Sequence, residues 1–173
     1  RIRDALFDGA ITGDYGGLQM SEVYSDHMVL QRDRPLAISG RADAGSEIVV
    51  KLVTKKGRVQ AYARTTSDNR GRWQVTLPPQ PAGEGYELHF FSSNANRYGS
   101  DQILWYKDVA IGEVWLCSGQ SNMAWRLEQS DGGMDAVRND EGLRLFDMKE
   151  RWVTDNLVWD SAAIDSVKHL QYY

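Results

Sequence analysis

The sequence has one cysteine among its 173 residues, no long hydrophobic run and no basic tract. A single cysteine, Cys117, excludes an internal disulfide, so the fold must depend on a hydrophobic core. No apolar stretch approaches the roughly 20 residues that a membrane-spanning helix needs. The net charge is −4 and the lysines and arginines are scattered, so the stripe of positive charge that nucleic-acid binding requires is missing. We therefore expect neither a membrane span nor a nucleic-acid partner.

What is present indicates a globular protein. Hydrophobic residues make up 42% of the chain, and six tryptophans and eight tyrosines supply apolar area that offsets chain entropy. The length suits one domain of ordinary size, or a small domain and part of a second. The first 17 residues carry no sustained period, and we interpret residues 1–17 as a tail.

Alternation of apolar and polar residues dominates residues 18–108. In "RWQVTL", for example, Trp73, Val75 and Leu77 share one face, which is the period of a half-buried strand. Turn signals separate such runs at short intervals, and this spacing predicts an antiparallel β-sandwich of jelly-roll or immunoglobulin-like type over 18–108. The expected strands are residues 35–41, 47–53, 58–64, 72–77, 86–90 and 102–109.

The pattern changes after residue 108. The nearly continuous apolar run over 109–119 is typical of a strand covered on both faces. Residues 121–129 have helical spacing, 132–142 have the composition of a second short helix, and 143–148 look like another strand. Strand, helix, helix, strand predicts the beginning of an α/β domain over 109–173, which is too short to complete a doubly wound sheet.

Ser121 lies where the apolar run gives way to the helical spacing, in "CSGQSNM". One interpretation is an ordinary helix N-cap, and spacing alone favours it. The other is a hydrolase nucleophile, because the end of a parallel strand is where α/β sheets place their chemistry. The G-x-S-x-G elbow of α/β-hydrolases is not matched, since Met123 stands at the last glycine.

Several longer stretches carry a family resemblance. "GEVWLCSGQSNM" resembles the nucleophile block of the sialate O-acetylesterase family, a branch of the SGNH (GDSL-like) carbohydrate esterases. "YSDHMVLQRDRPLAISGRADAGSEIVV" and "GRWQVTLPPQPAGEGYEL" are similar to the N-terminal β domain of that family. The resemblance runs in order from about Gln19 to about Phe146, and this favours the nucleophile interpretation. It also implies that 109–173 begin a flavodoxin-like, three-layer SGNH domain.

By this resemblance Ser121 is the nucleophile that forms an acetyl-enzyme, and its own N–H is one oxyanion donor. Gln120 stands where GDSL enzymes carry aspartate, and with Asn122 it is expected to shape the pocket. Asn122 as a simple cap stays open, as does Trp125 as a core residue or as part of the pocket mouth. The implied substrate is an O-acetylated sialic acid or related sugar, with no metal or organic cofactor. The implied location is exported, either periplasmic or extracellular, in a bacterium, or lysosomal in a eukaryote.

The catalytic base is not evident. His27 lies within the β domain and His89 on the polar face of an expected strand, so neither is a good candidate. His169 follows Asp165 at D-x-x-x-H, one residue longer than the family's D-x-x-H, and is close to Ser121 in sequence where the family histidine is far downstream. We expect the histidine and aspartate to lie beyond Tyr173, in a part of the hydrolase domain that this chain does not contain.

Two other roles compete with catalysis for the β domain. It is either a carbohydrate-binding module or a scaffold that orients the hydrolase domain. A flat row of exposed aromatic residues would favour binding, but Trp73 and Tyr86 fall at inward positions. The sequence therefore favours the scaffold role for residues 18–108.

Overall fold

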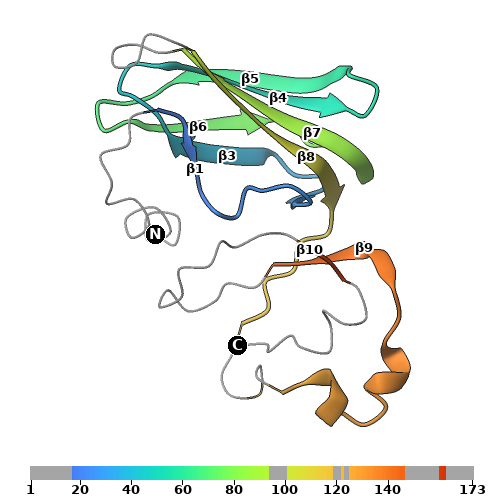
Figure 1. Cartoon of the computed structure of the whole chain (residues 1–173). Coiled ribbons are helices and arrows are strands. Elements are labelled where there is room, and N and C mark those ends of the chain that lie inside the picture. Colours follow the sequence, from blue (N-terminus) through green and yellow to red (C-terminus); the bar gives the residue numbers. More distant parts are fainter. Residues whose placement is uncertain (1–16, 94–100, 119–121, 123–124, 147–159, 163–173) are drawn as a thin grey trace.

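The computed structural model describes residues 17–93, 101–118, 122, 125–146 and 160–162. Within these ranges the chain is mostly β-sheet; it forms no α-helix, and its helical segments are short 3-10 turns. The strands lie in two sheets that face each other and in a separate two-stranded ribbon (Figure 1). None of the described helices is long and apolar enough to cross a membrane.

The smaller sheet has three antiparallel strands in the order β1-β3-β6. β3 and β6 pair over six residues, with Ile38 opposite Val75 and Gly40 opposite Trp73. The strands are β1 (Gln19–Met20), β3 (Leu36–Arg41) and β6 (Arg72–Leu77).

The larger sheet has five strands in the order β2-β8-β7-β4-β5. All neighbours are antiparallel except β2 and β8, which are parallel, so the expectation of a wholly antiparallel arrangement is wrong at that pair. A parallel pair needs a long connection, and nearly the whole domain lies between these two strands. The strands are β2 (Val29–Gln31), β4 (Glu47–Thr54), β5 (Val59–Thr66), β7 (Gly83–Ser92) and β8 (Gln102–Gly112).

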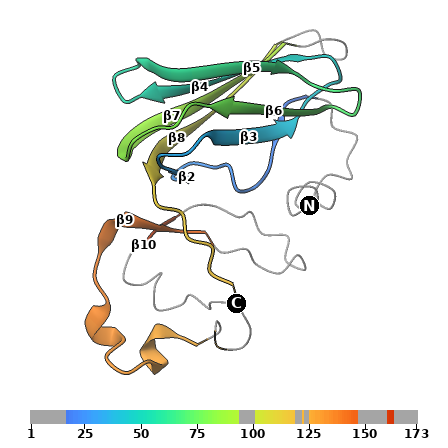
Figure 2. The ribbon, with the colours of Figure 1, turned by 180° about the vertical axis from the view of Figure 1, so that it is seen from behind.

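One hydrophobic core fills the space between the two sheets. The expected inward face of β6 is confirmed, because Trp73, Val75 and Leu77 are all buried and alternate with exposed residues. Phe90 of the larger sheet contacts Trp73 of the smaller one, with 6.2 Å between the ring centroids. Burial of such side chains is the main stabilising term of the fold. Figure 2 shows the same two layers from behind.

The segment after β8 differs from the expected strand and helix. The strand predicted over 109–119 pairs only as far as Gly112; residues 113–118 have no neighbouring strand and their side chains are exposed. Among the described residues of 121–129 there is one 3-10 turn, η2 (Leu127–Gln129), in place of a helix. So short a segment does not hold a helix without an apolar face buried against a partner.

The remaining elements form a small unit beyond the end of β8. A second 3-10 turn, η3 (Met134–Ala136), stands where a second short helix was expected. The expected strand near 143–148 is found as β9 (Asp140–Leu145), which pairs antiparallel with β10 (Asp160–Ala162). Both views place this unit away from β4 and β5 (Figures 1 and 2). An α/β domain over 109–173, and the division of the chain at residue 108, stay predictions.

Candidate functional site

The segment that leads to Ser121 leaves the two sheets at Gly112. Trp115 and Leu116 are among its most exposed side chains, at 83% and 85%, and Cys117 is exposed as well. Ser121 itself and Gln120 lie outside the described residues. The structure therefore describes the chain segment that precedes the candidate nucleophile, residues 113–118.

The beginning of this segment is held by the end of β2. The side-chain amide of Gln31 donates to Glu113 Oε2 at 3.1 Å, and its oxygen accepts from the backbone N–H of Val114 at 3.0 Å. The backbone N–H of Arg32 donates to the Gly112 carbonyl at 2.9 Å. These bonds continue the parallel β2–β8 pairing past the strand end. They set the direction in which the chain leaves the sheet toward Ser121.

Asn122 and Trp125 follow the candidate nucleophile. Asn122 is exposed, and its backbone carbonyl accepts from the N–H of Trp125 at 3.2 Å. Trp125 is 58% exposed, and its indole N–H donates to the Gln129 carbonyl at 3.0 Å. Of the two interpretations left open by the sequence, Trp125 as a core residue is wrong. Its aromatic face is available on the segment that follows Ser121.

Two of the three histidines pair with carboxylates. His27 Nδ1 lies 2.7 Å from Asp108 Oδ2, and His89 Nε2 lies 2.7 Å from Glu87 Oε2. A histidine held by a carboxylate is part of a general-base arrangement, but both pairs belong to the two-sheet domain. His169 lies outside the described residues. No spacing in the sequence indicated the His27–Asp108 contact, because 81 positions separate the two residues.

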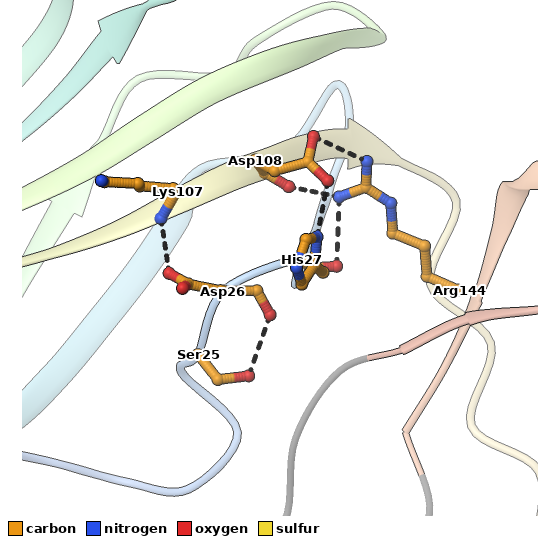
Figure 3. Close-up of polar contacts among 6 residues, drawn as sticks. All are labelled: Ser25, Asp26, His27, Lys107, Asp108 and Arg144. Atoms are coloured by element: carbon orange, nitrogen blue, oxygen red, sulfur yellow. Dashed lines mark hydrogen bonds and ion pairs between the residues drawn. The ribbon is translucent and has the colours of Figure 1, made fainter.

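Arg144 of β9 closes over the His27–Asp108 pair (Figure 3). One guanidinium nitrogen, Nη1, donates to the backbone carbonyls of His27, at 3.1 Å, and of Asp108. The other, Nη2, lies 3.1 Å from Asp108 Oδ1. The Arg144 side chain is only 8% exposed. Arg144 therefore attaches the unit after β8 to the two-sheet domain.

The backbone at this contact has an unusual conformation. His27 and Asp108 both have positive φ, at 66° and 51°. The loop that carries His27 is also bonded to β8, because the Lys107 N–H donates to Asp26 Oδ1 at 2.7 Å and the His27 N–H donates to the Lys107 carbonyl at 3.0 Å. These bonds hold a conformation that non-glycine residues seldom adopt. Figure 3 shows the resulting cluster.

The electrostatics of Asp108 follow from this arrangement. Desolvation by its surroundings acts to raise the pKa of the Asp108 carboxyl. The hydrogen bond from His27 and the charge of Arg144 outweigh that effect and hold the pKa below its ordinary value. Asp108 is therefore the anionic centre of the cluster. Among the residues that the structure describes, no group of three or more His, Cys, Asp or Glu side chains is arranged to hold a metal ion.

Known proteins resemble this chain over most of its length, although no family model matches it. It is 29% identical over 114 residues to the sialate O-acetylesterase of Rattus norvegicus and 31% identical over 116 residues to that of Pongo abelii, in each case over 65% of this chain. A solved structure described as a novel carbohydrate acetylesterase from Xanthomonas citri matches with a TM-score of 0.71 at 30% identity, over 89% of this chain and 34% of that one. The chain spans about a fifth of the length of the curated relatives, which is 20% for the rat protein and 21% for the Pongo protein.

Proposed function

Because this chain is homologous to the sialate O-acetylesterase family, we propose that it carries the nucleophile of a serine carbohydrate esterase. The substrate is an O-acetylated sialic acid or a related acetylated sugar. The observation that carries the proposal is the agreement between the curated relatives and the solved carbohydrate acetylesterase, both near 30% identity.

The proposed chemistry is a two-step acyl transfer. Ser121 Oγ attacks the acetyl carbonyl, its proton passes to a base, and a tetrahedral oxyanion forms. Collapse of this intermediate breaks the ester bond, the sugar oxygen takes the proton, and the acetyl group stays on Ser121. Water, deprotonated by the same base, then attacks the acetyl-enzyme; acetate leaves and the serine regains its proton. No metal or organic cofactor takes part in this scheme.

The neighbouring residues have supporting roles in the proposal. The Ser121 N–H is one oxyanion donor, an interaction worth roughly 3 kcal/mol in comparable hydrolases. Gln120 and Asn122 shape the pocket, and the exposed Trp125 lies at its mouth. We place the base and its aspartate outside these 173 residues, in the remainder of an SGNH domain that begins at residue 109. The large share of the relatives that this chain does not span supports that placement. An exported or lysosomal location is part of the same proposal.

Two serines three positions apart, Ser118 and Ser121, provide a sharp test. In the longest protein that contains this chain, Ser121→Ala is expected to lower the hydrolysis of O-acetylated N-acetylneuraminic acid by about 1,000-fold or more, as for other serine hydrolases. Ser118→Ala is the matched control, since Ser118 is an exposed serine of the same segment, and is expected to leave the rate near that of the parent protein. Equal rates for the two variants would remove Ser121 from the mechanism. The 173-residue chain alone is expected to be inactive; full activity would place the base within it.

A further inference from the structure

The outer face of the five-stranded sheet carries a row of exposed side chains across four strands. The register places Trp105 of β8 opposite His89 of β7, His89 opposite Lys51 of β4, and Lys51 opposite Tyr62 of β5. Trp105 is 51% exposed and Tyr62 is 66% exposed, so both aromatic rings are accessible to solvent. At about 4.8 Å between strands, the two lie about 14 Å apart.

A second row runs beside the first on the same face. Ile103 lies opposite Phe91, Phe91 opposite Val49, and Val49 opposite Arg64. Ile103 is 65% exposed, while Phe91 and Val49 are half-buried. Together the two rows make one continuous surface, which we call the outer platform. The sequence placed Trp73 and Tyr86 at inward positions, and the structure confirms this, because Trp73 lies in the core and Tyr86 packs against it.

The outer platform is positively charged in a chain whose net charge is −4. Lys51 and Arg64 are exposed, and neither forms an ion pair with a residue that the structure describes. Two acidic side chains lie at the margins of the same face. Glu87 is paired with His89 at 2.7 Å, and Glu47 lies two residues from Val49 on β4. A ligand with negative charge would find Lys51 between the two exposed aromatic rings and Arg64 beside Tyr62 on β5.

We propose that the outer platform binds an anionic oligosaccharide, namely a chain of carboxylate-bearing sugars such as sialic acids. One face of a pyranose ring presents mainly C–H groups, which pack against the faces of Trp and Tyr rings while the hydroxyls stay solvated. Lys51 and Arg64 pair with the sugar carboxylates. The distance from Tyr62 to Trp105 suits several linked sugars and not a single one. The choice of sialic acid as the sugar rests on the proposed function. The preference for an anionic glycan rests only on the aromatic and cationic side chains of the platform.

Self-association is a poor alternative occupant. A two-fold symmetric contact centred on this face would bring the Lys51 and Arg64 side chains of the two copies close together. Like charges at such an interface oppose association. A carboxylate-bearing glycan instead complements both the charge and the exposed aromatic rings.

Binding is tested apart from catalysis. The Ser121→Ala form of the chain is titrated by calorimetry with an α2,8-linked tetramer of N-acetylneuraminic acid that carries no O-acetyl group. A neutral glucose tetramer and a sulfated dextran of similar length are the comparison ligands. We expect saturable binding of the sialic acid tetramer and at least about tenfold weaker binding of the neutral one. Absence of sialic acid binding, or equally tight binding of sulfated dextran, would overturn the proposal.

Substitutions locate the binding on the sheet. Trp105→Ala, Tyr62→Ala and Lys51→Gln are each expected to lower the affinity about tenfold. Trp105→Phe, which keeps an aromatic ring, and Lys55→Gln, in the turn after β4, are the matched controls and are expected to retain it. All these side chains are exposed, and unchanged thermal midpoints confirm that the variants fold. Affinity that is insensitive to the three platform variants, or a dimer in sedimentation that Tyr62→Ala dissociates, would contradict the proposal.

The two proposals fail separately. Platform variants are expected to leave the hydrolysis of a small acetyl ester unchanged in the longest protein that contains this chain. Hydrolysis by the parent protein without any glycan binding by the unsubstituted platform would reject the platform alone. Loss of hydrolysis on Ser121→Ala has no bearing on the binding titration, because the tetramer carries no ester.

Discussion

The guanidinium of Arg144 lies 3.1 Å from the carboxylate of Asp108, joining β9 to the last strand of the two-sheet domain. The Arg144 side chain is nearly buried, and it also donates to the backbone carbonyls of His27 and Asp108. Charge-assisted hydrogen bonds are stronger than neutral ones, and the guanidinium that makes them here is nearly buried. This contact therefore attaches β9 to the two-sheet domain.

Replacing this arginine should loosen that attachment. Arg144→Met removes the bonds to His27 and Asp108, and about 2 kcal/mol of local stability is expected to be lost. In hydrogen exchange, protection should fall in residues 125–146 and stay unchanged in β4 and β7. Arg138→Met is the control, because Arg138 is 81% exposed and its ion pair with Asp140 spans 3.8 Å. Equal effects of the two variants would show that the contact does not anchor the unit.

The lowered pKa of Asp108 predicts a pH dependence. Since the folded-state pKa lies below the unfolded value near 3.8, the ionised carboxylate contributes stability above that value. The contribution is lost as the pH falls through the folded-state pKa. Asp108→Asn suits the positive φ of this position, because asparagine tolerates the left-handed region. We expect a lower urea midpoint for Asp108→Asn than for the parent chain near pH 7, and convergence of the two once the pH falls below the folded-state pKa of Asp108.

The control for that prediction is Asp131→Asn, which removes an exposed carboxylate elsewhere in the chain. It should leave the urea midpoint close to the parent value at both pH values. A gap between the parent and Asp108→Asn that persisted undiminished in acid would contradict the linkage.

The neighbouring residues Phe90 and Phe91 of β7 face opposite sides of the sheet, Phe90 toward the core and Phe91 toward the outer platform. Phe90 is 1% exposed and contacts the rings of Trp73 and Tyr106, at 6.2 and 5.8 Å between centroids. Phe90→Ala should cost about 3–5 kcal/mol in urea unfolding, because it leaves a cavity between the sheets. Phe91→Ala, on the outer face, should cost much less. If the order of the two costs were reversed, the assignment of the inner and outer faces of β7 would be wrong.

Two glycines with positive φ test how closely a turn packs. Gly71 has a φ of 73°, and a Cβ there would lie 2.4 Å from the Ala42 carbonyl oxygen. Gly57 has a φ of 77°, and a Cβ added at Gly57 would have no heavy atom within 4 Å. Gly57→Ala should therefore cost only the backbone strain of about 1 kcal/mol, and Gly71→Ala clearly more. Thermal unfolding of both variants measures the difference, and equal costs would show that the turn at Gly71 adjusts freely.

The sequence predicted the strands well where a period of two was strong. All six expected strands between residues 35 and 109 are found as β3 to β8, since alternating burial is a local property of each strand. β1 and β2 were not predicted, because two or three residues are too few to show a period. The parallel β2–β8 pair was missed for another reason: pairing between distant segments leaves no local signal.

Prediction was weaker around the candidate site. The apolar run up to Cys117 indicated a covered strand, yet the strand ends at Gly112, because no neighbouring strand pairs with the residues that follow. The helix predicted from the spacing of Met123 and Leu127 is reduced, in its described part, to one 3-10 turn. Hydrophobicity gives the tendency to be buried, while burial itself requires a partner surface.

The sequence by itself determined the strand periods, the inward face of the core and the likeness to carbohydrate esterases around Ser121. These depend on the order of residues along short stretches. Only the tertiary structure decided that Arg144 meets His27 and Asp108, and that Trp105 and Tyr62 share one exposed face. Both arrangements depend on strand order and register, which bring residues that are distant in the chain within bonding or stacking reach.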